Sequence, residues 1–271
     1  MEQNRARIAA QGLGLAAISY DSVAVLKTFA DREHIGYTLL SDADSKVIRA
    51  YGIFNDTVPK DSFAYGIPNP GTYILDAHGV VVGKYFEDDY RVRDTAESIL
   101  FRQFGIEPEP RSSVAAKHLK IAVEGGETPV RPDQRVTLAV DLQLPERMHV
   151  YAPGVTGGYI PISFKLSPSP AFQADPVTFP ASKTLRLEVI HETVPVFMGR
   201  FRLLDTVTLA GPQQVQPLLD AQGNLPVEGD LRYQACDDHE CYPPETVHLK
   251  WTLQVLAFDR TRAPESLRRK Q

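Results

Sequence analysis

Hydrophobic residues in the first hundred positions recur at two spacings, one typical of helices and one typical of strands. The predicted elements, in chain order, are a strand at 13–19, helices at 23–30 and 45–51, strands at 72–75 and 80–86, and a helix at 95–104. Asp21 or Ser22 can cap the first helix, and Gly52 can end the second. Helices and strands that alternate in this way predict an α/β layered fold.

The pattern changes beyond residue 117, where apolar and polar residues alternate with period two. This alternation is clearest from Val247 to Val255, whose odd-numbered positions are all apolar. Strands are predicted at 119–123, 136–142, 162–166, 185–190, 204–209, 231–235 and 247–255. Short strands with one apolar face, separated by Pro/Gly turns, predict an antiparallel β-sandwich.

A segment rich in Pro, Ser and charge separates the two patterns and predicts a linker. The expected organisation is an α/β domain at 1–104, a linker at 105–116, a β-domain at 117–258 and a basic tail at 259–271. The length of 271 residues agrees with two domains of ~150 residues or less.

Composition narrows the class of protein. A content of 43% hydrophobic and 23% charged residues is typical of globular chains. The net charge of -5 gives no basic face for nucleic acid, so we expect no nucleic-acid partner. No apolar run approaches the ~18 residues of a membrane-spanning helix, and the start shows no apolar stretch typical of a signal peptide.

The candidate chemistry lies in the two cysteines of the chain, Cys236 and Cys241. Two cysteines this close in sequence are compatible with a redox-active pair, a structural disulfide, or a zinc site completed by His239 or His248. A structural zinc site needs four ligands, and no second Cys or His pair at ligand spacing is present. We expect a redox pair, with no bound metal and no cofactor.

The residues around the cysteines set expectations for exposure and reactivity. If the strand at 231–235 buries Leu231, Tyr233 and Ala235, alternation turns Cys236 to the opposite face, toward solvent or a partner. Carboxylates at 237, 238 and 240 disfavour a thiolate more strongly than a neutral His239 favours one. We therefore expect thiol pKa values at or above the usual ~8.5.

Residues 12–100 resemble the later part of the alkyl hydroperoxide reductase/thiol-specific antioxidant family, which has a thioredoxin fold and includes the peroxiredoxins. The resemblance is carried by the segments 17–22, 40–42, 47–52, 70–76 and 78–80. It implies that Pro70 takes the place of a proline that is often cis and flanks the active site.

The family's reactive cysteine would stand on a strand and helix that precede residue 12. We therefore expect an incomplete thioredoxin-like lobe, in which the central strand is missing and the chain begins inside a larger protein. No residue of this lobe inherits peroxidase chemistry.

Residues 117–257 resemble the immunoglobulin-like N-terminal domain of Dsb-type thiol:disulfide interchange proteins. The segments 233–236 and 241–246, which contain the cysteines, carry the resemblance, together with 196–200. Four residues separate the cysteines here, against five in the family. The resemblance implies that Phe197 shields the pair, and that Tyr233, His239 and Tyr242 shape the site; Phe197 as an ordinary core residue is the alternative.

These resemblances imply a thiol–disulfide oxidoreductase in which Cys236 and Cys241 exchange electrons with thioredoxin-type proteins, in an antioxidant or disulfide-reduction pathway. They also imply a periplasmic or otherwise extracytoplasmic location, where a membrane protein could be a partner. We expect Cys241 to be the attacking cysteine. The alternative is a non-catalytic interaction module with a structural disulfide and a degenerate thioredoxin-like lobe.

Overall fold

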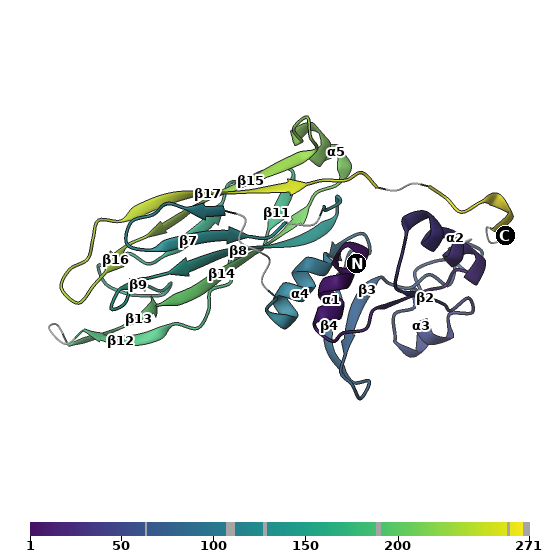
Figure 1. Ribbon diagram of the computed structural model, residues 1–271, viewed down its shortest axis with the longest axis horizontal. Coiled ribbons are helices and arrows are strands. Elements are labelled where there is room, and N and C mark those ends of the chain that lie inside the picture. Colours follow the sequence, from purple (N-terminus) through teal and green to yellow (C-terminus); the bar gives the residue numbers. More distant parts are fainter. Residues whose placement is uncertain (63, 107–111, 127–128, 188–190, 259–260, 268–271) are drawn as a thin grey trace. The chain divides into compact units, whose positions relative to one another are not determined.

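The computed structural model describes the chain apart from residues 63, 107–111, 127–128, 188–190, 259–260 and 268–271 (Figure 1). It contains two compact units, one formed by residues 1–103 with 258–271 and the other by residues 104–257. Among the described residues, no helix is both long and apolar enough to cross a membrane.

The first unit alternates helices and strands, as the sequence pattern predicts. Its helical elements are the 3₁₀ turns η1 (Glu2–Asn4) and η3 (Glu265–Leu267) and the helices α1 (Arg5–Ala10), α2 (Val23–Glu33), α3 (Lys46–Ala50) and α4 (Ala96–Phe104). Its strands are β1 (Ala16–Ser19), β2 (Thr38–Ser41), β3 (Gly71–Leu75), β4 (Val81–Phe86) and β5 (Arg93–Asp94).

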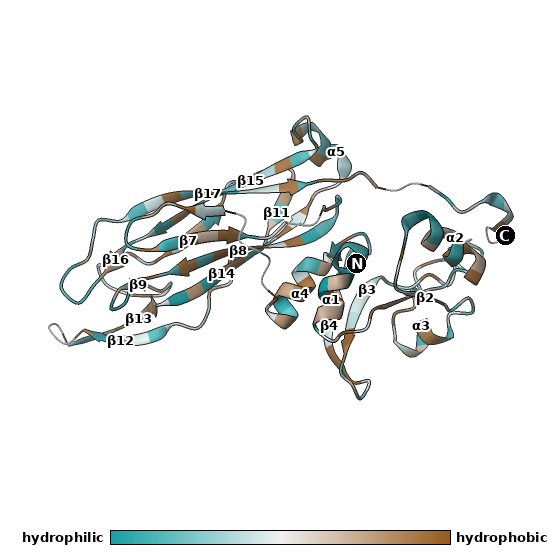
Figure 2. Cartoon of the chain, viewed as in Figure 1, coloured by the Kyte–Doolittle hydropathy of each residue, from teal (hydrophilic) through white to brown (hydrophobic). Residues whose placement is uncertain are grey.

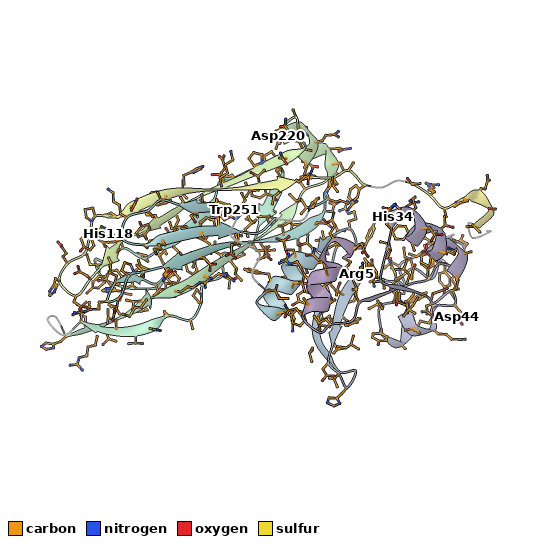
Figure 3. The ribbon with its side chains drawn as sticks, in the orientation of Figure 1. Arg5, His34, Asp44, His118, Asp220 and Trp251 are labelled. Atoms are coloured by element: carbon orange, nitrogen blue, oxygen red, sulfur yellow. A yellow bond between two sulfur atoms is a disulfide. The ribbon has the colours of Figure 1, made fainter. Side chains whose placement is uncertain are left out.

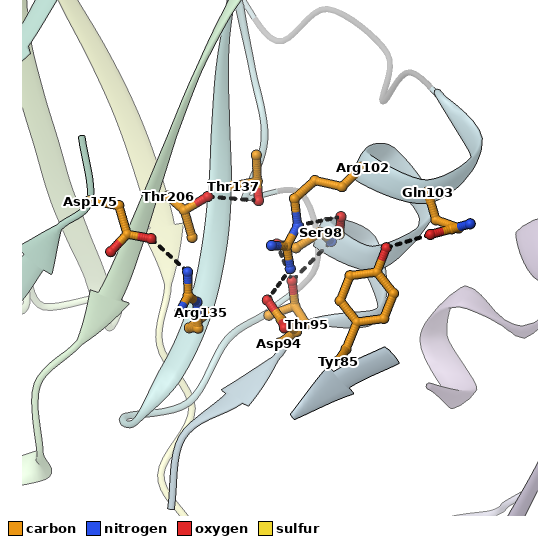
Figure 4. Close-up of polar contacts among 10 residues, drawn as sticks. All are labelled: Tyr85, Asp94, Thr95, Ser98, Arg102, Gln103, Arg135, Thr137, Asp175 and Thr206. Carbon is orange, nitrogen blue, oxygen red and sulfur yellow. Dashed lines mark hydrogen bonds and ion pairs between the residues drawn. The ribbon is translucent and has the colours of Figure 1, made fainter. Parts of the chain in front are cut away.

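Local side-chain contacts fix the ends of these elements. Ser22 caps α2, because its hydroxyl accepts a hydrogen bond from the backbone N–H of Val25 at 3.4 Å. Thr95 does the same for α4, where the N–H of Ser98 donates to its hydroxyl at 3.1 Å (Figure 4). The strands predicted at 72–75 and 80–86 pair as a hairpin, and the Asp76 carboxylate accepts hydrogen bonds from the backbone N–H groups of His78 and Val80 in its turn.

Four strands of this thioredoxin-like unit form two separate pairs. β1 pairs with β2 in parallel, and β3 pairs with β4 in antiparallel fashion. Within the described part of the unit, no strand joins the two pairs. Large apolar side chains of this unit that are exposed include Val23, Val80 and Val82.

The second unit is an immunoglobulin-like β-sandwich. Its strands are β6 (Ser112–Val114), β7 (Lys120–Glu124), β8 (Gln134–Gln143), β9 (His149–Tyr151), β10 (Ser163–Leu166), β11 (Phe172–Ala174), β12 (Lys183–Leu187), β13 (Glu192–Met198), β14 (Arg200–Leu209), β15 (Asn224–Tyr233), β16 (Ala235–Cys236) and β17 (Glu245–Gln254). The short helix α5 (Pro212–Val215) and the 3₁₀ turn η2 (Gln216–Leu218) precede β15.

These strands form three sheets, in the orders β11-β14-β8-β7-β6, β10-β15-β17 and β12-β13-β9-β16. Brown and teal residues alternate along the strands in Figure 2, and the apolar ones pack in the interior. Trp251 of β17 joins two sheets, because its buried indole N–H donates to the backbone carbonyl of Glu124 in β7 at 3.0 Å (Figure 3).

The sandwich differs from the predicted strand set in its short strands. β6 lies within the predicted linker and pairs with β7. β9, β11 and β13 were not predicted; β9 and β11 have three residues each, too few to show a period. The last residues of the predicted strand at 185–190 lie outside the described residues.

One acidic side chain interrupts the apolar interior of β14. Asp205 occupies an inward position between Leu203 and Val207, is 3% exposed, and its Oδ1 atom has no hydrogen-bond partner among the described residues. Burial, reinforced by the charge of Asp175, raises the pKa of Asp205 to about 7. Asp175 is itself paired with Arg135 at 2.6 Å (Figure 4).

The raised pKa makes the stability of the sandwich depend on pH. Between the ordinary Asp pKa near 3.8 and the folded value of about 7, the folded state keeps a proton that the unfolded state releases, so stability falls as the pH rises through this range. Asp205→Asn removes this dependence. Between pH 5 and pH 8, we expect the free energy of unfolding of the variant to increase relative to that of wild type by roughly 1–4 kcal/mol.

Denaturant unfolding at the two pH values measures this gain. If the free energies of unfolding of variant and wild type differ by the same amount at pH 5 and at pH 8, Asp205 does not titrate in this range.

Candidate functional site

The two cysteines form a disulfide at the end of the sandwich where β9, β13 and β16 lie (Figure 1). The sulfur atoms of Cys236 and Cys241 are 2.01 Å apart, and the Cα atoms are 4.0 Å apart. Cys236 ends β16, and the two cysteines face each other across an antiparallel bridge that closes a tight hairpin loop. The disulfide therefore lies at the base of this hairpin loop.

The chain reaches this position by changing sheets. β15 pairs with β17 as far as Tyr233, and after Gln234 the chain continues as β16, which pairs instead with β9. Leu231, Tyr233 and Ala235 are buried, as the alternation predicts. β16 therefore belongs to the third sheet. Because Ala235 points into the main core, Cys236 lies on the opposite face of that sheet, which we call the outer face.

The expectation that Cys236 faces solvent is wrong, because the outer face is itself covered. Cys236 is 1% exposed and packs with a second apolar cluster, which we call the outer cluster. Its buried members are Tyr151, Val194, Val196 and Cys236, with Val155, Tyr159, Leu185, Leu187 and Met198 packed around them. Cys241, by contrast, is exposed. The disulfide thus joins a buried cysteine, Cys236, to an exposed one, Cys241.

Phe197 lies on the opposite face of the same sheet. It is in register with Val150, belongs to the main core, and stacks on Phe201 with ring centroids 4.8 Å apart. These contacts are those of a core residue. The aromatic side chain that does meet the disulfide is Tyr151, whose hydroxyl is 3.6 Å from Sγ of Cys241.

Asp237 organises the loop between the cysteines. Its Oδ1 atom accepts the backbone N–H groups of His239 at 2.7 Å and Glu240 at 2.9 Å, and Oδ2 accepts the hydroxyl of Tyr242 at 2.8 Å. The hydrogen bonds from the Glu240 and His239 amides, followed by that from Tyr242, lower the pKa of Asp237 to about 2. His239 contributes its backbone to this turn, while its side chain is exposed.

Contacts outside the loop hold it against the rest of the sandwich. The ring of Tyr242 stacks on His118, with centroids 3.9 Å apart. The Arg147 guanidinium donates to the Asp238 carboxylate at 2.7 Å. Further back, the buried hydroxyl of Tyr233 lies 2.6 Å from the Glu245 carboxylate, and burial is the first cause of its raised pKa. Tyr233 and Tyr242 therefore shape the site through the chain around it.

Pro70 belongs to the other unit and precedes β3. No cis peptide bond occurs among the described residues, so the bond before Pro70 is trans and the cis form implied by the resemblance is not found. The trans form is favoured unless neighbouring groups enforce the other isomer.

Sequence reasoning missed two residues beside the disulfide, His149 and Tyr151. Both stand on β9, a strand of three residues whose hydrogen-bond partners, β13 and β16, lie far along the chain. The signal available in the sequence was a short run of large side chains before a Pro-Gly turn, which does not indicate a pairing partner.

Comparison with known proteins finds a similarity for part of each unit. Residues 1–84 match the model of the AhpC/TSA family, and residues 123–252 match that of the thiol:disulfide interchange protein DsbD, N-terminal. Peroxiredoxin Q, chloroplastic, of Arabidopsis thaliana is 41% identical over 70 residues, which cover 26% of this chain and 30% of that protein. The Triticum aestivum protein of the same name is 35% identical over 91 residues, 32% of this chain and 39% of that one. The chain thus spans well under half of these relatives.

Among solved structures, the N-terminal periplasmic domain of ScsB from Proteus mirabilis matches with a TM-score of 0.36 and 9% identity, over 53% of this chain and 50% of that one. The N-terminal domain of Neisseria meningitidis DsbD in the reduced form matches with a TM-score of 0.31 and 15% identity, over 51% of this chain and 87% of that one.

Both matching family models indicate thiol–disulfide redox chemistry, and the disulfide lies within the second match. Residues 1–84 are thus similar to the AhpC/TSA family, and residues 123–252 are similar to the N-terminal domain family of DsbD.

Proposed function

We propose that the chain is a thiol–disulfide exchange protein that passes electrons between its Cys236–Cys241 pair and partner dithiols of the thioredoxin type. The observation that carries this proposal is the unequal burial of the two cysteine residues, with Cys241 exposed and Cys236 enclosed by the outer cluster. An attacking thiolate can approach only an accessible sulfur, so the geometry gives the exchange one point of entry.

The reaction follows from this asymmetry. A partner thiolate attacks Sγ of Cys241, the Cys236–Cys241 bond breaks, and its electron pair passes to the sulfur of Cys236. The second thiol of the partner then attacks the mixed disulfide and releases Cys241. The pair gains two electrons and the partner becomes a disulfide; the reverse sequence oxidises the pair. Cys241 is accordingly the cysteine that bonds to the partner.

The structure also bears on the alternative of a structural disulfide. A structural disulfide is most useful where little else holds a loop, whereas this loop keeps the hydrogen bonds of Asp237 and the ion pair of Arg147 with Asp238. These contacts do not involve sulfur, so they can keep the two thiols close together after reduction. That property suits a pair that opens and closes repeatedly.

An extracytoplasmic, periplasmic location is part of the proposal. The DsbD N-terminal family match supports it, and the matched ScsB domain is described as periplasmic. Disulfide chemistry of this kind belongs to oxidising compartments. A membrane protein could then be the partner in the periplasm.

Single-cysteine variants test which sulfur forms the bond with the partner. Cys236→Ser leaves the exposed thiol of Cys241, and we expect it to capture a thioredoxin whose attacking cysteine carries a nitrothiobenzoate group, as a mixed disulfide seen on non-reducing gels. Cys241→Ser leaves only a buried thiol, so its capture rate should be at least about tenfold lower. Equal rates, or no capture by either variant, would contradict the proposal.

Asp237→Ala tests whether the loop positions the thiols. Loss of its hydrogen bonds should lower the effective concentration of one thiol at the other, and the disulfide should become easier to reduce. We expect the reduction potential to rise by about 30 mV for each tenfold loss of this effective concentration.

Glu240→Ala is the matched control, because it removes a neighbouring carboxylate of the loop while keeping the backbone N–H that Asp237 accepts, and its potential should equal that of wild type. Equilibration with glutathione buffers measures both variants. Potentials equal to wild type in Asp237→Ala would show that the turn does not hold the reduced pair.

A further inference from the structure

One buried polar group beside the disulfide is unexplained by the fold. His149 is 4% exposed, and its Nε2 atom has no hydrogen-bond partner among the described residues. Burying such a nitrogen without a partner is destabilising, so most sequences place an apolar residue or a partnered one in this position.

The register of the third sheet places His149 next to the buried cysteine. In the antiparallel pairing of β9 with β16, His149 stands directly opposite Cys236. Directly opposed residues project from the same face of a sheet, with Cβ atoms about 4.5–5.5 Å apart. His149 therefore shares the outer face with the sulfur of Cys236.

Tyr151 links His149 to the second sulfur. Its ring meets that of His149 edge-on, with centroids 5.4 Å apart, while its hydroxyl is 3.6 Å from Sγ of Cys241. On the other side, β13 contributes Met198, which is opposite His149 and carries no charge. The imidazole of His149 and the side chain of Cys236 thus lie in one buried layer.

The charges around His149 favour its neutral form. Burial lowers the pKa of His149, and the nearby Asp238 and Asp237 carboxylates oppose this only in part. Asp238 is also paired with Arg147. Burial, followed by the charge of Glu192, raises the pKa of Tyr151, which leaves that side chain a neutral phenol. Near neutral pH, His149 is thus available as a proton acceptor.

We propose that His149 accepts the proton of the Cys236 thiol when the disulfide closes and returns it when the disulfide opens. The proposal rests on the exchange function above. A buried thiol has no access to bulk water, so it needs a neighbouring base to become a nucleophile. His149, opposite Cys236 and with a free ring nitrogen, supplies one.

The step is balanced in protons and electrons. The proton of the Cys236 thiol passes to Nε2 of His149, and the sulfur attacks Sγ of Cys241 in the mixed disulfide. The bond between Cys241 and the partner breaks, and the partner leaves as a thiolate. In the opposite direction, Cys236 leaves from Cys241 and takes the proton from the His149 imidazolium.

The test uses the reduced full chain and 5,5′-dithiobis(2-nitrobenzoate) as probe. Release of the first nitrothiobenzoate reports attack by Cys241, and release of the second reports ring closure by Cys236. We expect His149→Gln to slow the second phase roughly ten- to hundredfold at pH 7 and to leave the first phase unchanged.

The pH profile separates proton transfer from packing. In wild type, the second phase should fall below the lowered pKa of His149 and level off above it. In His149→Gln it should instead rise about tenfold per pH unit up to the thiol pKa. His149→Phe, which keeps a ring in the outer cluster, should show the same loss, so the test does not depend on one variant folding.

His248→Gln is the control, because His248 is exposed on β17 and contacts Asp230. It should match wild type in both phases. A second phase of unchanged rate and pH profile in His149→Gln or His149→Phe would overturn the proposal. Because the probe is not a protein, this result is independent of whether thioredoxin-type partners reduce the pair.

Discussion

The site depends on the pairing of β16 with β9. Up to Tyr233 the chain belongs to the sheet of β10, β15 and β17, and from Ala235 it belongs to the sheet of β9, β12 and β13. This change of sheet brings Cys236 opposite His149 and under the outer cluster, and it leaves the returning strand to carry Cys241 at the surface. If β16 continued along β17, the cysteines would lie on a simple hairpin with neither enclosure nor a neighbouring imidazole.

The enclosure has a chemical consequence. A disulfide with two exposed sulfurs can be attacked at either, whereas this one offers Cys241 alone. The buried sulfur must gain or lose a proton away from water, which is unfavourable unless a side chain takes part. Three features around the disulfide are relevant to this proton transfer. They are the position of His149, the turn formed by Asp237, and the contact of Tyr151 with Cys241.

Sequence reasoning predicted the parts of the fold that depend on local patterns. The Ser22 cap, the turn at Asp76 and the period-two strands were predictable because each is set by neighbouring residues. Alternation also predicted correctly that Cys236 turns away from Ala235. It did not predict burial, because Val194 and Val196, which cover that face, come from a strand about forty residues earlier.

The candidate site was therefore only partly predictable. The cysteine spacing indicated that the two residues can pair, while Asp237 was recognised for its charge and not as the acceptor that holds the turn. His149 carried no signal, because a lone histidine on a strand of three residues acquires meaning only from its partner strand.

The central claim is that Cys236 and Cys241 form an exchanging pair and not a structural disulfide. The reduction potential of the wild-type chain, measured by equilibration with defined thiol–disulfide buffers, tests this most directly. The account predicts a potential in the range of thioredoxin-type proteins, about -270 to -120 mV. A pair that stays oxidised well below about -300 mV would contradict it and would show that the disulfide serves to stabilise the loop.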